Sequence, residues 1–166
     1  MSTEWNYKMK NKPVVLFDID YTIFDTQKFK ESRLQDFNTY KEVEELLMKL
    51  NDIATLGIFS KGGNEFQRTK LENTGMIKFF EENCIHIFDD KDAKLIDVLG
   101  KYKNSKLFLV DDKLGILYSA KKLMPELTAI WVKRGPYAQA EQSIENFVPD
   151  ATIENLSNLF NLVSVN

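Results

Sequence analysis

The chain has 166 residues, which is enough for one compact domain with a sizeable core and too few for two typical domains. Hydrophobic residues make up 43% and charged residues 28% of the sequence, as in ordinary globular proteins. Because 22 basic residues face 25 acidic ones, the net charge is −3. The chain therefore lacks the overall positive charge that marks proteins of nucleic-acid or membrane surfaces.

The first twelve residues are polar and contain no apolar core of a signal peptide. We expect residues 1–12 to be a lead-in to a single domain at 13–166. No stretch approaches the roughly 18 consecutive apolar residues of a membrane span, so we expect no membrane contact. Cys84 is the single cysteine, which excludes an internal disulfide and favours the reduced cytoplasm as the location. The sequence leaves the oligomeric state open, and an oligomer is compatible with it.

In chain order, strand-like segments alternate with helix-like segments. Apolar runs rich in β-branched and aromatic residues predict strands at 14–17, 55–59, 85–88, 107–110 and 128–132. Helical spacing of apolar residues predicts helices at 43–50, 66–72, 93–99, 116–123 and 153–163. Strands that are apolar throughout and alternate with helices predict a three-layer α/β/α Rossmann-like domain. Its central sheet would be mainly parallel and five-stranded.

Polar residues follow four of the predicted strands. In chain order these are Asp18 and Asp20, then Ser60 and Lys61, then Asp89, Asp90 and Lys91, and last Asp111 and Asp112. Parallel sheets bind ligands outside the carboxyl ends of their strands, near the point where the strand order reverses. We therefore predict that the four groups meet in one site.

The spacing of Asp18 and Asp20 indicates a cation. Two carboxylates held together repel each other unless a positive charge offsets them, and a divalent cation does so most directly. The candidate ligands of this site are oxygen atoms, which suit Mg²⁺ better than zinc. The sequence thus predicts a site for Mg²⁺ at the carboxyl ends of the strands.

These motifs resemble the haloacid dehalogenase-like superfamily of aspartate-nucleophile phosphohydrolases, over nearly the whole chain. The first motif has the form D-x-D-x-T behind an apolar strand and runs from Asp18 to Thr22. The second ends at Ser60, the third is a lysine, and the fourth ends in Asp111 and Asp112. Besides the fold, the resemblance implies a Mg²⁺-dependent phosphatase.

The resemblance implies two roles for the first motif. Asp18 would be the nucleophile that forms an aspartyl-phosphate, and its other oxygen would bind Mg²⁺. Asp20 would protonate the leaving oxygen and then activate water, while its backbone carbonyl binds Mg²⁺. One carboxylate serves both steps because the proton that it gives in the first is recovered in the second. Thr22 is expected to brace this loop through its hydroxyl.

The other motifs would supply charge stabilisation and the rest of the metal site. Ser60 and Lys91 are expected to hold the transferring phosphoryl group, with Lys94, one helical turn later, as the alternative lysine. Asp112 is expected to complete the metal site. Asp111 would be a further metal ligand or a support behind it.

Asp20 also bears on the type of reaction. True haloacid dehalogenases lack this second aspartate because their leaving halide needs no proton, so Asp20 favours phosphoryl transfer. The gaps between the motifs are too short for an inserted cap domain, and we expect no large cap and an open site. An open site suits a large substrate, such as a phosphoprotein or a nucleic-acid end, and cover by a second subunit is the alternative. The partner is thus a phosphate ester, small or macromolecular, with nucleic acid only as a substrate. Residues 25–40 are the one candidate for a small lid, with an ordinary surface helix as the alternative.

A competing hypothesis from another class is a non-catalytic binding or regulatory protein that keeps the fold and the metal. The presence of every motif residue needed for turnover argues against it, and an assay decides. A phosphomutase would need a means to keep water from the aspartyl-phosphate, which a site without a cap does not offer. We interpret His86, in the middle of the predicted strand 85–88, as structural.

Overall fold

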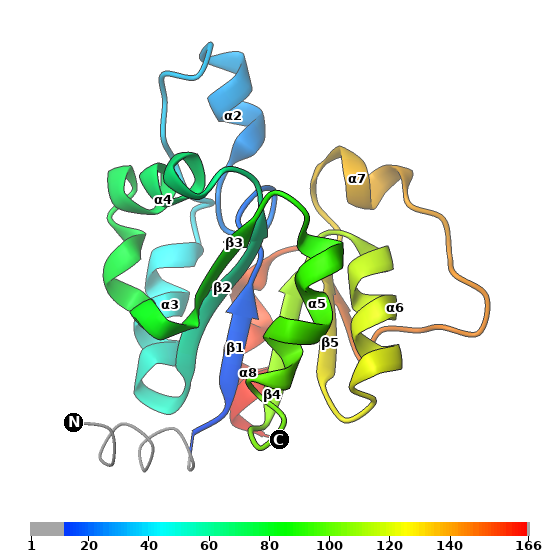
Figure 1. The fold of residues 1–166 in the computed structure, drawn as a ribbon. Coiled ribbons are helices and arrows are strands. Elements are labelled where there is room, and N and C mark those ends of the chain that lie inside the picture. Colours follow the sequence, from blue (N-terminus) through cyan, green and yellow to red (C-terminus); the bar gives the residue numbers. More distant parts are fainter. Residues whose placement is uncertain (1–11, 166) are drawn as a thin grey trace.

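The computed structural model describes residues 12–165 of the chain (Figure 1). The predicted lead-in at residues 1–12 therefore lies outside the described residues except for Lys12. The strands are β1 (Val14–Phe17), β2 (Thr55–Lys61), β3 (Ile85–Phe88), β4 (Leu107–Asp111), β5 (Thr128–Val132) and β6 (Ala151–Ile153). The α-helices are α2 (Thr26–Glu31), α3 (Val43–Ile53), α4 (Asn64–Asn73), α5 (Lys91–Gly100), α6 (Leu114–Leu123), α7 (Gly135–Ala140) and α8 (Leu159–Ser164).

Three short 3₁₀ helices complete the described part of the chain. They are η1 (Met76–Phe79), η2 (Glu82–Cys84) and η3 (Leu156–Asn158). None of the helices between residues 12 and 165 has both the length and the apolar character needed to cross a membrane.

The sheet is parallel throughout, with the strand order β3-β2-β1-β4-β5-β6. The prediction of a parallel sheet with alternating helices is confirmed, but the prediction of five strands is wrong because β6 adds a sixth. β6 pairs with β5, with Ala151 opposite Ile130 and Ile153 opposite Val132. This strand is too short and too exposed to produce a continuous apolar run. The predicted helix at 153–163 begins later, with η3 and then α8.

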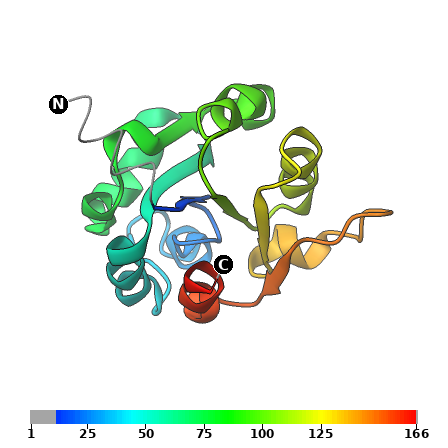
Figure 2. The same cartoon turned by 90° about the horizontal axis from the view of Figure 1, so that it is seen from below.

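Helices cover both faces of the sheet, as Figure 2 shows from below. α3 and α8 pack on one face, and their core includes Val43, Leu47 and Leu159. α5 and α6 pack on the other face, and their core includes Leu95 and Leu117. Because every residue of β1 is buried between the two layers, the central strand is apolar from end to end.

The topology places the end of β1 beside the end of β4. From β1 the chain moves outward to β2 and β3 and then crosses back to β4 on the other side of β1. Phe17 is in register with Val110 of β4, and the Asp18 amide donates to the Val110 carbonyl at 2.9 Å. The residues that follow these strands therefore meet at the switch in strand order, where open parallel sheets bind ligands.

The start of α5 fixes the position of Lys91. The Asp90 side chain accepts a hydrogen bond from the Ala93 amide at 3.0 Å, which caps the helix. α5 consequently begins at Lys91, two residues before the predicted start. Lys91 thus projects from the first turn of a helix that begins immediately after β3.

Gly57 lies where β2 passes close to the turn before β3. A Cβ atom at this position would lie 2.5 Å from the Cys84 carbonyl oxygen and 2.7 Å from the Cys84 Cβ. Backbone atoms of a buried sheet have little freedom to move away, so a side chain here would overpack the core.

We expect Gly57→Ala to lower the free energy of unfolding by about 2 kcal/mol or more. Gly100→Ala is the matched control, because a Cβ atom at Gly100 meets nothing within 4 Å and the position is helical. That control should leave stability unchanged or raise it by about 0.5 kcal/mol. Urea denaturation midpoints measure both effects, and an equal loss in the two variants would contradict the assignment of overpacking to Gly57.

His86 is buried in β3, with one ring nitrogen 2.6 Å from the Tyr102 hydroxyl. Burial disfavours the charged imidazolium, and nearby Lys101 adds repulsion, so the pKa of His86 falls to about 4. Its burial and hydrogen bond agree with a structural role for this side chain.

The lowered pKa of His86 predicts a dependence of stability on pH. Below its ordinary pKa of about 6.5, the unfolded chain binds a proton that folded His86 does not. The stability that neutral His86 contributes is therefore present above pH 6.5 and is lost as the pH falls toward about 4. In urea denaturation across this window, His86→Gln should reduce the slope of unfolding free energy against pH by up to about 1.4 kcal/mol per pH unit. Identical slopes for wild type and variant would exclude a suppressed protonation at His86.

Candidate active site

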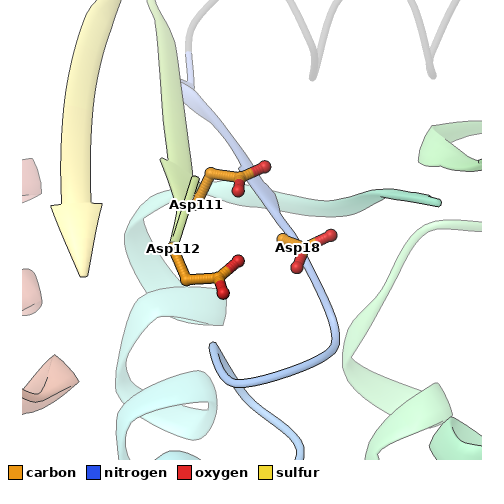
Figure 3. A group of neighbouring side chains, drawn as sticks. All are labelled: Asp18, Asp111 and Asp112. Atoms are coloured by element: carbon orange, nitrogen blue, oxygen red, sulfur yellow. The ribbon is translucent and has the colours of Figure 1, made fainter. Parts of the chain in front are cut away.

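Three carboxylates meet at the ends of β1 and β4. Asp18 follows β1 directly, Asp111 ends β4, and Asp112 follows it. All three are buried, and each offers an oxygen within 4.8 Å of the oxygens of the other two. Figure 3 shows their side chains projecting into the space between the two strand ends. The structure thus brings together the side chains of three of the four aspartates that the sequence assigns to the metal site.

Lys91 joins this cluster from α5. Its Nζ lies 3.1 Å from Asp18 Oδ1 and 2.5 Å from Asp111 Oδ2. Burial alone would lower the pKa of Lys91, but the two carboxylates outweigh it and raise that pKa, so the ammonium stays charged. Lys94 is half-exposed and lies near Asp97, at 3.9 Å. Of the two candidate lysines, the structure places Lys91 in the cluster and Lys94 outside it.

Asp111 and Asp112 differ in their partners. Asp111 uses both oxygens, because Oδ2 contacts Lys91 and Oδ1 accepts a hydrogen bond from the Lys113 amide at 2.8 Å. Both oxygens of Asp112 are buried and have no hydrogen-bond partner among residues 12–165. The Trp131 indole donates a hydrogen bond to the Asp112 backbone carbonyl at 3.0 Å, which holds the backbone at this residue.

The electrostatics of the cluster favour a bound cation. Burial, with repulsion from Asp18 and Asp111, raises the pKa of Asp112 to about 9. Burial also raises the pKa of Asp18 to about 7, although Lys91 works against this shift. Buried carboxylates this close, with two oxygens unpartnered, are the hard oxygen donors that a divalent cation such as Mg²⁺ requires. The residues present therefore fit the predicted metal.

Asp20 belongs to a separate set of contacts. Its Oδ1 accepts hydrogen bonds from the Lys70 ammonium at 2.7 Å and from the Thr26 hydroxyl at 2.8 Å. Its Oδ2 accepts one from the Gln67 amide at 2.9 Å. Burial would raise the pKa of Asp20, but the charge of Lys70 and these hydrogen bonds outweigh burial and lower it. The Asp20 side chain is therefore a charged carboxylate held from three directions.

Ser60 is linked to Asp20 through Gln67. The Gln67 amide nitrogen lies 3.0 Å from the Ser60 hydroxyl while it also donates to Asp20. Ser60 is buried near the end of β2, the strand next to β1. The structure thus brings the predicted residues Asp18, Asp20, Ser60 and Lys91 to the same end of the sheet.

Sequence reasoning missed the three residues that hold Asp20. Gln67 and Lys70 are three positions apart on α4, which begins shortly after Ser60. Residues three positions apart share one face of a helix. Two polar side chains on one such face, buried near a strand end, are the signal that could have identified Gln67 and Lys70. Thr26 was also missed.

The expected brace by Thr22 is wrong. The Thr22 hydroxyl is buried and has no hydrogen-bond partner in the described part of the chain. Thr26 makes the bracing contacts in its place, since its hydroxyl accepts from the Tyr21 amide at 3.2 Å and donates to Asp20.

A cavity of about 470 Å³ opens onto the site. Asp18 and Asp112 line it, and α2 contributes Thr26, Phe29 and Lys30 to its wall. In Figure 1, α2 rises above the carboxyl ends of the strands. The segment 25–40 thus forms a wall of the cavity. The expectation of an open site without a large cap stays a prediction, with this segment as one wall of the cavity.

The sequence of the chain matches no family of known proteins and no curated protein. Solved structures, in contrast, share its fold over nearly the whole chain. A protein from Burkholderia xenovorans, described as a haloacid dehalogenase-like hydrolase, aligns with 93% of this chain and 98% of its own at a TM-score of 0.77 and 21% identity.

Two further structures extend the comparison. One described as a phosphatase from Clostridium difficile covers 92% of this chain and 99% of its own, with a TM-score of 0.71 and 18% identity. A haloacid dehalogenase-like hydrolase from Bacillus subtilis, bound to magnesium, covers 92% and 99% with a TM-score of 0.70 and 12% identity. The chain therefore has the fold of the haloacid dehalogenase-like hydrolases, as the motifs predicted.

The contacts of Lys91 predict a difference between the two candidate lysines. Lys91→Met removes the positive charge between Asp18 and Asp111 and leaves both carboxylates buried without it. In EDTA, we expect the free energy of unfolding to fall by about 3 kcal/mol. Lys94→Met, the same change one helical turn away, should alter it by no more than about 0.5 kcal/mol because that side chain is exposed. Similar denaturation midpoints for the two variants would contradict the placement of Lys91.

Proposed function

We propose that the protein is a Mg²⁺-dependent phosphatase, a phosphoric monoester hydrolase that acts through an aspartyl-phosphate. The observation that carries this proposal is the presence of two kinds of carboxylate in one cavity. Asp18 belongs to a buried cluster suited to a cation, and Asp20 is held apart from that cluster by its own partners. A nucleophile and a separate acid–base group are what hydrolysis of a phosphate ester requires.

The metal would be held by Asp18, by Asp112 and by the backbone carbonyl of Asp20. Asp112 is favoured over Asp111 as a direct ligand because its two oxygens are unpartnered, whereas those of Asp111 are used by Lys91 and the Lys113 amide. Mg²⁺ would neutralise the carboxylates and draw charge from the phosphoryl group. Asp111 would support the site from behind by fixing Lys91.

In the first step, an oxygen of Asp18 attacks phosphorus. The bond between Asp18 and phosphorus forms as the bond from phosphorus to the leaving oxygen breaks. Lys91, 3.1 Å from Asp18 Oδ1, would orient the nucleophile and meet the charge of the phosphoryl oxygens. The Ser60 hydroxyl would donate a hydrogen bond to another phosphoryl oxygen.

Asp20 would move the protons of both steps. It gives a proton to the leaving oxygen and then takes one from the water that attacks phosphorus, which releases phosphate and restores Asp18. Lys70 keeps Asp20 charged, which suits the second step. For the first step Asp20 must carry a proton, and an arriving phosphoryl dianion favours this because like charges raise the pKa of a carboxylate.

The cavity supports a small phosphate ester, or the phosphorylated end of a larger molecule, as the substrate. Nucleic acid enters the proposal only as a substrate of this kind. We keep the cytoplasm as the proposed location and place no membrane among the partners. An oligomer is compatible with the proposal.

Dehalogenation and simple binding are the competing functions. A dehalogenase has no use for a group that protonates the leaving atom, so the position of Asp20 in the cavity favours a phosphate ester. A binding protein that keeps the fold would bind Mg²⁺ without turnover. One assay, which measures phosphate release and the labelling of the protein by the substrate, distinguishes these alternatives.

We expect phosphate release from a panel of generic and metabolite phosphate esters that depends on Mg²⁺ and stops with EDTA. Asp18→Asn should lower the rate by at least about a thousandfold because the nucleophile is gone. Asp20→Asn should lower it about a hundredfold or more through loss of proton transfer. After acid quenching, ³²P from a labelled substrate should remain on wild type and be absent from Asp18→Asn.

Asp97→Asn is the matched control, since Asp97 is exposed on α5 and far from the cluster; its activity should equal that of wild type. Wild-type activity in Asp18→Asn would exclude Asp18 as the nucleophile. Mg²⁺ binding without release from any ester of the panel would support the binding protein instead.

A further inference from the structure

One wall of the cavity is built from two lysines and two tyrosines, which we call the lysine–tyrosine wall: Tyr21, Lys30, Lys113 and Tyr137. The Lys30 ammonium donates to the Tyr21 hydroxyl at 3.2 Å. The Tyr21 and Tyr137 rings meet edge to face, with centroids 5.9 Å apart. Lys113 Nζ lies 4.6 Å from the centroid of the Tyr137 ring. All four residues line the cavity beside Asp18, Asp20 and Asp112.

The wall joins segments that are far apart in the sequence. Tyr21 lies in the loop after β1, Lys30 on α2, Lys113 just before α6 and Tyr137 on α7. Gly135 permits the closest approach, because it has a φ of +79° and a Cβ atom there would lie 2.5 Å from Tyr21 Cδ1. Only glycine combines this backbone with so close a contact. The backbone of α7 is therefore packed directly against the loop that carries Asp18 and Asp20.

The two lysines of the wall have no acidic partner. Lys30 is exposed and Lys113 is partly exposed at the mouth of the cavity. The buried cations of the site are paired, Lys70 with Asp20 and Lys91 with Asp18 and Asp111. Between residues 12 and 165, neither Lys30 nor Lys113 forms an ion pair, and their recorded side-chain contacts are the tyrosine hydroxyl and the ring faces. The wall thus presents two ammonium groups to the cavity that form no ion pair with a carboxylate of the described chain.

The wall lies close to the place proposed for the phosphoryl group. Lys113 follows Asp112 directly, and its amide donates to Asp111 at 2.8 Å. Lys30 and Lys113 both line the cavity that Asp18, Asp20 and Asp112 also line. A ligand bound at Asp18 would therefore need only a short spacer to reach the wall.

We infer that the substrate carries a second anionic group, a carboxylate or a further phosphate, on a short spacer from the phosphoryl group, and that Lys30 and Lys113 bind this group. The inference rests on the proposed function for the position of the phosphoryl group. Its own basis is the unpaired positive charge of the wall. Ammonium groups in a partly enclosed cavity bind anions through charge-assisted hydrogen bonds, and aromatic neighbours do not cancel their charge. The tyrosine hydroxyls add donors for the same anion.

The competing role for these lysines is to bind the transferring phosphoryl group itself. Direct binding separates the two roles without any turnover. The probes are matched pairs of phosphonates with the same spacer, one ending in a carboxylate and one in a methyl group, such as 3-phosphonopropionate and propylphosphonate, over two to four carbon spacers. Their affinities are measured by calorimetry with Mg²⁺ present.

For wild type we expect the carboxylated phosphonate of at least one spacer length to bind about tenfold or more tightly than its methyl partner. Lys30→Met and Lys113→Met should each reduce this ratio about threefold or more, with little change for the methyl partner. The controls are Lys28→Met, also on α2 but 68% exposed, and Lys122→Met, an exposed lysine on α6. Both should keep the wild-type ratio.

Three results would overturn the inference: no preference at any spacer length, a preference that survives in both lysine variants, or an equal loss of affinity for both members of a pair. The last would assign the lysines to the phosphoryl group. Hydrolysis of a generic ester is measured on the same preparations. If the protein hydrolyses the ester but shows no preference for the carboxylated phosphonate, this inference alone fails. If it shows a preference that depends on the lysines but does not hydrolyse the ester, the proposed function fails and the anion site remains.

Discussion

Burial of three carboxylates at the ends of two adjacent strands is the constraint on which the rest of the site depends. β1 and β4 are neighbours in register, so the residues after Phe17 and Val110 lie side by side. Charged carboxylates in such a place are unstable without compensation. The chain supplies part of it as Lys91, which enters from the first turn of α5 and contacts two of the three. The unpartnered oxygens of Asp112 mark where the remaining compensation belongs.

Asp20, two residues after Asp18, is stabilised as a charged carboxylate by a different set of partners. Its carboxylate is bound by Lys70 and Gln67 of α4 and by Thr26 of α2. Two aspartates with nearly the same sequence position are thereby given separate partners and shifts of pKa in opposite directions. Groups with diverging pKa values are suited to different chemical roles. This division depends on helices that follow the loop, not on the loop alone.

The sheet and the main carboxylate cluster could be predicted from the sequence because their signals are local. Apolar runs fix the strands, and parallel strands bring Asp18, Asp111 and Asp112 to one edge once the topology is set. β6 escaped prediction because three partly exposed residues give no periodic pattern. Gln67 and Lys70 escaped because their role is a contact across about fifty residues of chain, which helix propensity does not encode. The expectation fell on Thr22, which is nearer to Asp20 in the sequence, whereas the bracing contacts of Thr26 follow from the tertiary structure.

Because α2 is short, its first residue and its cavity-facing residues lie about one turn apart. Its first residue, Thr26, is hydrogen-bonded to Asp20, and one turn later Phe29 and Lys30 face the cavity. Asp25 caps the helix and Phe29 packs against Phe24, so both the start and the middle of α2 are held to the loop before it. The same short helix therefore both borders the space open to a ligand and holds the carboxylate of Asp20 through Thr26.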